Sequence, residues 1–258
     1  MNWSYENPGG IEEEVLNREK EPEELTKLRE DAHQGDPQAQ GRLGTMLALG
    51  EEVAQDLDEA IRWLKLAADQ SDIASMFNLG IIYEQGLGVA VDPDEAGLWY
   101  WQAAEKGDAG AKVKLGTMLL KGVGFAPGSQ VTESIRASAD SGVPYAQAFL
   151  GKLYLDGIGM DQDDVGAEVW FRKAAGQGDE SALFNLGEMM SEGRTVETSE
   201  DEVAQWFYDF GMGFLSDRNI VKAFDCLVSI KRIIPDHFLA QRLESEIDRQ
   251  NEASHGGQ

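Results

Sequence analysis

The sequence has few of the residues from which metal and nucleophilic sites are usually built. It contains one cysteine, Cys226, and three histidines, His33, His237 and His255. A single cysteine excludes a disulfide within the chain. No Cys-x-x-Cys or His-x-x-x-His pair is present to indicate a zinc site. We therefore expect no metal and no cofactor.

Basic residues are also scarce. The chain has 22 Lys and Arg residues against 47 Asp and Glu residues, a formal net charge of −25. Such a surface repels the phosphates of nucleic acids and the headgroups of anionic lipids, so we expect neither nucleic acid nor a membrane as a partner. It attracts a protein with a basic surface and speeds the encounter. Acidic residues also keep helical arrays soluble, and charge alone favours this second explanation.

Long apolar runs and a secretory signal are absent from the sequence. The N-terminal stretch, MNWSYENPGGIEEEVLNREKEPEEL, has neither a basic start nor an apolar segment after it. No run reaches the roughly 18 apolar residues that a membrane-spanning helix needs. Together with the single cysteine, these features predict a cytoplasmic protein in a reducing compartment.

What the sequence does contain is a repeat of 35 or 36 residues. Five Leu-Gly pairs mark it, at positions 43–44, 79–80, 115–116, 150–151 and 186–187. A Trp follows four of these leucines by twenty residues, at Trp63, Trp99, Trp170 and Trp206. A period of this length is typical of stacked helical hairpins, in which no repeat buries its own apolar face alone.

Each repeat reads as two helices. In the second copy the pattern predicts a first helix that starts near Asp72 and ends at Gly86, because glycine accepts the left-handed conformation of a helix C-cap. Asp92 and Pro93 then start a second helix, since Asp caps an N-terminus and Pro suits the first turn. Trp99 has the same register in this helix as its counterparts, which favours core packing over a ladder for stacking a ligand.

These features resemble the Sel-1-like repeat (SLR) family, a group of α/α solenoids related to tetratricopeptide repeats. The resemblance implies an all-α fold, a right-handed α/α superhelical solenoid of stacked helical hairpins. We expect about five SLR units between N- and C-terminal capping helices. The third copy departs from the pattern, because it is one residue short and lacks the Trp. After the fifth copy, the spacing from Phe207 to Pro235 resembles a tetratricopeptide motif.

The register of the repeats sets the expected domain boundaries. Residues 1–22 are expected to be a mobile segment with room for a short helix, and residues 23–35 an N-terminal capping helix. The five repeats span 36–214, as units 36–71, 72–107, 108–142, 143–178 and 179–214. Residues 215–250 are predicted to form tetratricopeptide-like helices, and residues 251–258 a disordered tail.

A partner surface is predicted from the geometry of tetratricopeptide arrays, in which the first helix of each unit lines the concave face. On that geometry, residues beside the Leu-Gly pairs point into a groove, where aromatics anchor a partner and acids pair with its Lys or Arg. The predicted partner-binding residues are Phe77, Asn78, Ile81, Glu84, Tyr145, Phe149, Lys152, Phe184, Asn185, Glu188 and Glu192. Alternatively each aromatic packs against the neighbouring hairpin, and the sequence leaves this choice open.

The resemblance implies an intracellular protein-protein interaction module and not an enzyme. A more specific hypothesis is an acidic inhibitor, an immunity-type protein that neutralises a basic partner such as a nuclease toxin. The alternative is a regulatory adaptor or assembly factor whose concave groove binds a peptide or helix. A third class, an enzyme or cell-wall-associated protein, ranks last because such SLR members usually carry paired cysteines and a signal sequence. The oligomeric state stays open.

Overall fold

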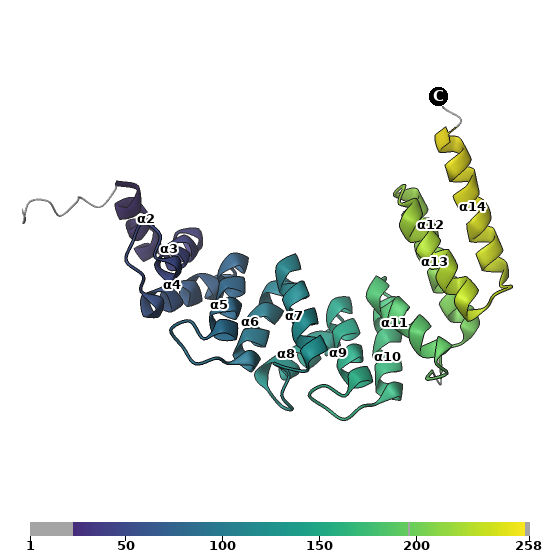
Figure 1. The fold of residues 1–258 in the computed structure, drawn as a ribbon, viewed down its shortest axis with the longest axis horizontal. Helices are drawn as coiled ribbons and strands as arrows, with labels where there is room; N and C mark the ends of the chain where they lie inside the picture. Colours follow the sequence, from purple (N-terminus) through teal and green to yellow (C-terminus); the bar gives the residue numbers. More distant parts are fainter. Residues whose placement is uncertain (1–22, 196, 256–258) are drawn as a thin grey trace, which may run out of the picture.

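The computed structural model describes residues 23–195 and 197–255, which form thirteen helices and no strand. The helices stand side by side in an elongated, curved array with α2 at one end and α14 at the other (Figure 1). This confirms the predicted all-α solenoid of stacked hairpins. None of the described helices is long and apolar enough to cross a membrane. The segment 1–22, predicted to be mobile, lies outside the described residues.

Ten of the helices form the five repeats. The first helices are α3 (Pro37–Leu49), α5 (Ile73–Gln85), α7 (Ala109–Lys121), α9 (Pro144–Asp156) and α11 (Glu180–Ser191). The second helices are α4 (Leu57–Asp69), α6 (Pro93–Glu105), α8 (Gln130–Asp140), α10 (Asp164–Ala175) and α12 (Glu200–Ser216). Helix α2 (Glu23–His33) precedes the repeats, and α13 (Ile220–Ile233) and α14 (Phe238–His255) follow them.

Local signals set most of these helix ends, as the sequence predicted. The Asp72 side chain accepts the backbone N–H of Ser75, and Gly86 ends the same helix in the left-handed conformation with φ 72°. Seven helices begin with an aspartate that caps them in this way: Asp36, Asp56, Asp72, Asp92, Asp108, Asp163 and Asp179. A carboxylate at a helix N-terminus also complements the helix dipole. Part of the acidic excess therefore stabilises helix ends.

The Leu-Gly pairs lie where the two helices of a repeat meet. The five leucines are fully buried, and in four repeats the glycine permits a large side chain of the second helix to approach the first. A Cβ atom placed on Gly80 would lie 2.4 Å from the Tyr100 ring. The corresponding contacts are Gly44 with Leu64, Gly151 with Phe171 and Gly187 with Phe207, at 2.8, 2.8 and 3.0 Å. The glycines are therefore packing positions in four repeats.

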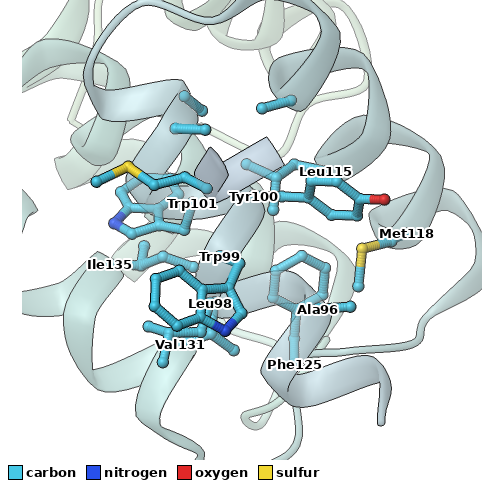
Figure 2. Packing of buried hydrophobic residues seen from close by; sticks show 14 of the residues in the cluster. Ala96, Leu98, Trp99, Tyr100, Trp101, Leu115, Met118, Phe125, Val131 and Ile135 are labelled. Atoms are coloured by element: carbon cyan, nitrogen blue, oxygen red, sulfur yellow. The ribbon is translucent and has the colours of Figure 1, made fainter. Parts of the chain in front are cut away.

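The third repeat is the exception. No atom lies within 4 Å of a Cβ placed on Gly116. Within the described residues, α7 packs extensively only against α6, whereas α8 packs against α6 and α9. Leu115 of α7 and Ile135 of α8 both join the cluster around Trp101 of α6 (Figure 2). The two helices of the third repeat are thus each held by α6 instead of by each other.

The C-terminal end corrects one expectation. The tail predicted to be disordered from residue 251 continues α14 as far as His255, and residues 256–258 lie outside the described residues. Ile247 of α14 is buried, and the side chain of Gln250 donates a hydrogen bond of 2.9 Å to the carbonyl oxygen of Leu215 in α12. These contacts fix the turn of α14 just before residue 251, and the helix continues from there.

Candidate functional site

The side chains most capable of catalysis or metal binding have structural roles. Within the described residues, no group of three or more His, Cys, Asp or Glu side chains is placed to hold a metal ion. Burial, with the nearby charge of Glu180, raises the pKa of Cys226 to about 12, so its thiol is protonated at neutral pH. His237 accepts the backbone N–H of Leu239 at 3.2 Å through Nδ1, and its Nε2 lies 3.1 Å from Asp201.

The predicted binding residues on α5 are largely occupied by neighbouring helices. Phe77 is half-buried, with its ring centroid 5.6 Å from that of Tyr100. The Asn78 amide donates a hydrogen bond of 3.0 Å to the Thr45 hydroxyl on α3. Ile81 is also half-buried and packs against the core. Phe77 therefore packs within its own repeat, and Asn78 joins α5 to the preceding repeat.

Glu84 forms the most developed polar contact on this helix. Its carboxylate accepts hydrogen bonds from the Tyr100 hydroxyl and from the Lys114 ammonium, both at 2.6 Å. Burial disfavours the charged carboxylate, but the hydrogen bonds from Lys114 and Tyr100 outweigh burial and hold the pKa of Glu84 below its usual value. Glu84 therefore links α5, α6 and α7.

The two predicted aromatic residues on α9 face inward. Tyr145 stacks on Trp101 of α6, with ring centroids 5.5 Å apart and planes 15° apart. Phe149 is buried and contacts the same Trp101 at 5.4 Å. Lys152 forms an ion pair with Asp156 one turn along the helix, at 2.9 Å. The aromatic side chains of α9 thus fill the space between α6 and α9, across the displaced third repeat.

The predicted residues on α11 are the most accessible of the set. Phe184 is half-buried and Glu188 is exposed. The Asn185 amide donates a hydrogen bond to the backbone carbonyl oxygen of Ser181, within the same helix. Glu192 ends the helix and lies 3.2 Å from Arg194. Of these four residues, Phe184 and Glu188 face the same hollow.

That hollow, the α11–α13 groove, has a volume of about 280 Å³. Its lining residues are Phe184, Glu188, Asp225, Val228, Ser229 and Arg232. Within the described part of the chain, the charged side chains of Glu188, Asp225 and Arg232 form no ion pair with one another or with other residues. The groove therefore combines an apolar floor with unpaired charge at its edge.

The α13 side of this groove was missed by the sequence reasoning, which treated α13 as part of a capping unit. Its signal is present in the sequence, because α13 has two apolar stripes. One stripe contains Leu227 and is buried against α12 and α14, and the other contains Val221, Phe224 and Val228 and is exposed. A capping helix needs only the first stripe. Of the second stripe, Val228 lines the groove beside α11.

A second hollow lies between α3 and α5, with a volume of about 460 Å³. Polar side chains dominate its lining, which includes Arg42, Thr45, Glu52 and Asp72. The predicted residue Asn78 borders it through its hydrogen bond to Thr45. This hollow lies between consecutive first helices, and the α11–α13 groove lies between the fifth first helix and a helix that follows the repeats. Of the two, the α11–α13 groove has the aromatic floor that protein interfaces use as an anchor.

The sequence model of the Sel1 repeat family matches this chain at residues 37–72, 73–108, 144–179 and 180–209, more than half of its length. The third repeat is the copy without a match, in agreement with its unusual packing. No curated protein matches the chain in sequence.

Solved structures of three bacterial repeat proteins are similar to this chain. A protective antigen of uropathogenic Escherichia coli with an SLR fold is 27% identical over 89% of this chain and 50% of its own, with a TM-score of 0.46. A Sel1 repeat protein from Oxalobacter formigenes is 28% identical over 77% of this chain and 82% of its own, with a TM-score of 0.43. A Sel1 repeat protein from Klebsiella pneumoniae is 22% identical over 81% of this chain and 98% of its own, with a TM-score of 0.32. The chain spans half the length of the Escherichia coli protein.

Proposed function

Because this chain belongs to the Sel1 repeat family, whose repeats are protein-protein interaction modules, we propose that it binds a basic partner protein through the α11–α13 groove. Sel1 repeat proteins are typically non-enzymatic scaffolds.

The groove itself is the observation that carries the proposal. Phe184 and Val228 form an apolar floor, and the carboxylates of Glu188 and Asp225 stand beside it without an ion pair in the described residues. An apolar side chain of the partner would anchor on the floor, and a Lys or Arg next to it would pair with these carboxylates. Arg232 on the same lining would donate hydrogen bonds to a carboxylate of the partner and thereby fix its orientation.

The more specific proposal is that the chain is an immunity-type inhibitor, which neutralises a basic protein such as a nuclease toxin. The net charge of −25 supports this version. A strongly acidic solenoid would cover the cationic cleft with which a nuclease holds its phosphate substrate, and long-range attraction would make the association fast and sensitive to salt.

Affinity capture with a charge-reversed variant tests the proposal. The tagged chain and its Glu188→Lys/Asp225→Lys variant are exposed to lysate of the native cells, and retained proteins are identified at low and high salt. The matched control, Asp69→Lys/Asp140→Lys, makes the same charge change at exposed positions at the ends of α4 and α8. We expect one basic protein that the control retains and the variant loses. A partner indifferent to both salt and the groove variant would contradict the proposal.

A second candidate function is an adaptor that binds an apolar peptide or helix. The exposed stripe on α13, in which Phe224 and Val228 lie one turn apart, favours this reading. Here Phe224→Ala would weaken binding more than the Glu188→Lys/Asp225→Lys change. A synthetic peptide of the captured protein would then bind alone, whereas an inhibitor of a folded enzyme would require the intact partner.

A further inference from the structure

Helix α7 of the third repeat presents an apolar face that no other described helix covers. Ala109, Val113, Gly116 and Leu120 follow one another at three- and four-residue spacing, so they share one side of the helix. Val113 is 70% exposed and Leu120 is 88% exposed. The buried residues of α7, which include Leu115 and Met118, lie on the opposite side. We call the first set the α7 face.

The other repeats indicate what fits such a face. In those four repeats the equivalent glycine is contacted by a Leu, Tyr or Phe side chain of the second helix. Around Gly116 that space is open, because α8 packs against α6 and α9 instead of α7. The α7 face therefore has space for a helix with one bulky apolar side chain, and no second helix of its own repeat occupies that space.

The charge of α7 indicates what kind of helix would bind to the α7 face. In a chain of net charge −25, α7 contains Lys112, Lys114 and Lys121 and no acidic residue. Lys114 is engaged by Glu84, and Lys112 lies 4.8 Å from the centre of the Tyr145 ring. Lys121 is exposed and forms no ion pair within the described residues. Lys112 and Lys121 flank the α7 face, so a helix with acidic flanks complements it.

We propose that the α7 face binds an amphipathic, acidic α-helix of a partner protein, with a bulky apolar side chain seated against Gly116. A second copy of this chain fits less well, because two lysine-bearing α7 helices would then be opposed. The surface is separate from the α11–α13 groove and has the opposite local charge. The proposal therefore holds or fails independently of the proposed function.

A peptide copied from the chain's own second helices provides a defined probe. Residues 56–70, which include α4, contain four acidic residues and Leu64, the side chain that contacts Gly44 in the first repeat. Short isolated helices are only marginally stable in water. A hydrocarbon staple between positions 62 and 66, on the side of the helix opposite Leu64, therefore holds the peptide helical. Binding of the labelled peptide to the full chain is followed by fluorescence anisotropy. The matched probe carries Leu64→Ala.

Three full-length variants locate the binding. Gly116→Leu extends a side chain into the space where a Cβ atom meets no neighbouring element, and Leu120→Glu adds a repelling charge to the α7 face. Val165→Glu is the control, because Val165 is 49% exposed on α10, which belongs to neither the α7 face nor the α11–α13 groove. We expect saturable binding that Gly116→Leu, Leu120→Glu and the Leu64→Ala probe each weaken about tenfold or more, and that the control leaves unchanged.

Two results would overturn the proposal. One is the absence of binding, or binding that Gly116→Leu and Leu120→Glu do not alter. The other is a concentration-dependent dimer in sedimentation of the chain alone that Leu120→Glu dissociates, since the α7 face would then be covered by a second copy. Circular dichroism of each variant establishes that the helical array is intact, so a loss of binding reports on the surface.

Discussion

The same substitution in the Leu-Gly pairs of two repeats should have opposite effects on stability. Gly80→Ala and Gly116→Ala each place a methyl group at the same position of a first helix. At Gly80 the new Cβ atom would lie 2.4 Å from one carbon of the fully buried Tyr100 ring and 2.5 Å from another. At Gly116 it would meet no atom within 4 Å. The two variants therefore differ in packing and not in their helical setting.

The magnitudes follow from two contributions. Replacing Gly by Ala inside a helix stabilises by roughly 0.5–1 kcal/mol, because the unfolded glycine has more freedom to lose. Forcing a methyl group into a packed core costs about 1–3 kcal/mol, because the ring must leave its preferred position. We expect Gly116→Ala to raise the free energy of unfolding by roughly 0.5–1 kcal/mol, and Gly80→Ala to lower it by up to about 2 kcal/mol.

Urea denaturation followed by circular dichroism measures both changes. Repeat arrays can unfold in more than one step, so the comparison requires that the slope of stability against urea be the same in all three proteins. If both variants shifted the midpoint in the same direction by the same amount, α7 would be packed like the other first helices. The account of the third repeat would then be wrong.

Three further predictions concern single side chains. Native Cys226 should react with a maleimide at pH 8 orders of magnitude more slowly than the urea-unfolded chain, because its pKa is raised to about 12 in the fold; equal rates would show an accessible thiol. The lowered pKa of Glu84 stabilises the fold above about pH 4.5, the ordinary pKa of the carboxyl, and this stabilisation is lost as the pH falls through the lower folded pKa. The stability difference between wild type and Glu84→Gln should therefore be constant from about pH 6 to 8 and shrink below about pH 4.5, and a difference that grew on acidification would refute the charge pairing. Phe224→Ala should leave the urea midpoint almost unchanged, because its ring is exposed, and a large loss would show that the ring is part of the core.

The fold was predictable because its signals are local. Asp72, Gly86 and Asp92 act on the backbone within a few residues of themselves, so their spacing alone marks where helices begin and end. The Leu-Gly period likewise marked the repeat, and each of its leucines is buried. The packing of the third repeat was less accessible. Its missing Trp and missing residue show that it departs from the repeat pattern. The helix against which α7 packs, however, depends on how α6, α8 and α9 meet.

The candidate site was predictable only in part, for the same reason. Phe149 lies one residue before its Leu-Gly pair and is buried against Trp101, whereas Phe184 lies two residues before its pair and borders an open groove. The difference arises from this shift in register and from what lies across from each helix. Trp101 reaches α9 because the third repeat is displaced, while α13 stands far enough from α11 to leave a hollow. Such distances between helices follow from packing across repeats and not from local pattern.

The salt dependence of partner association tests the central claim most directly. With the protein captured by the wild-type chain, the association rate is measured by stopped flow between about 50 mM and about 500 mM NaCl. If the acidic surface recruits a basic partner to the α11–α13 groove, the rate should fall by about tenfold or more over this range. Glu188→Lys/Asp225→Lys should flatten that dependence, and Asp69→Lys/Asp140→Lys should alter it less. A rate independent of salt and of both variants would contradict the claim.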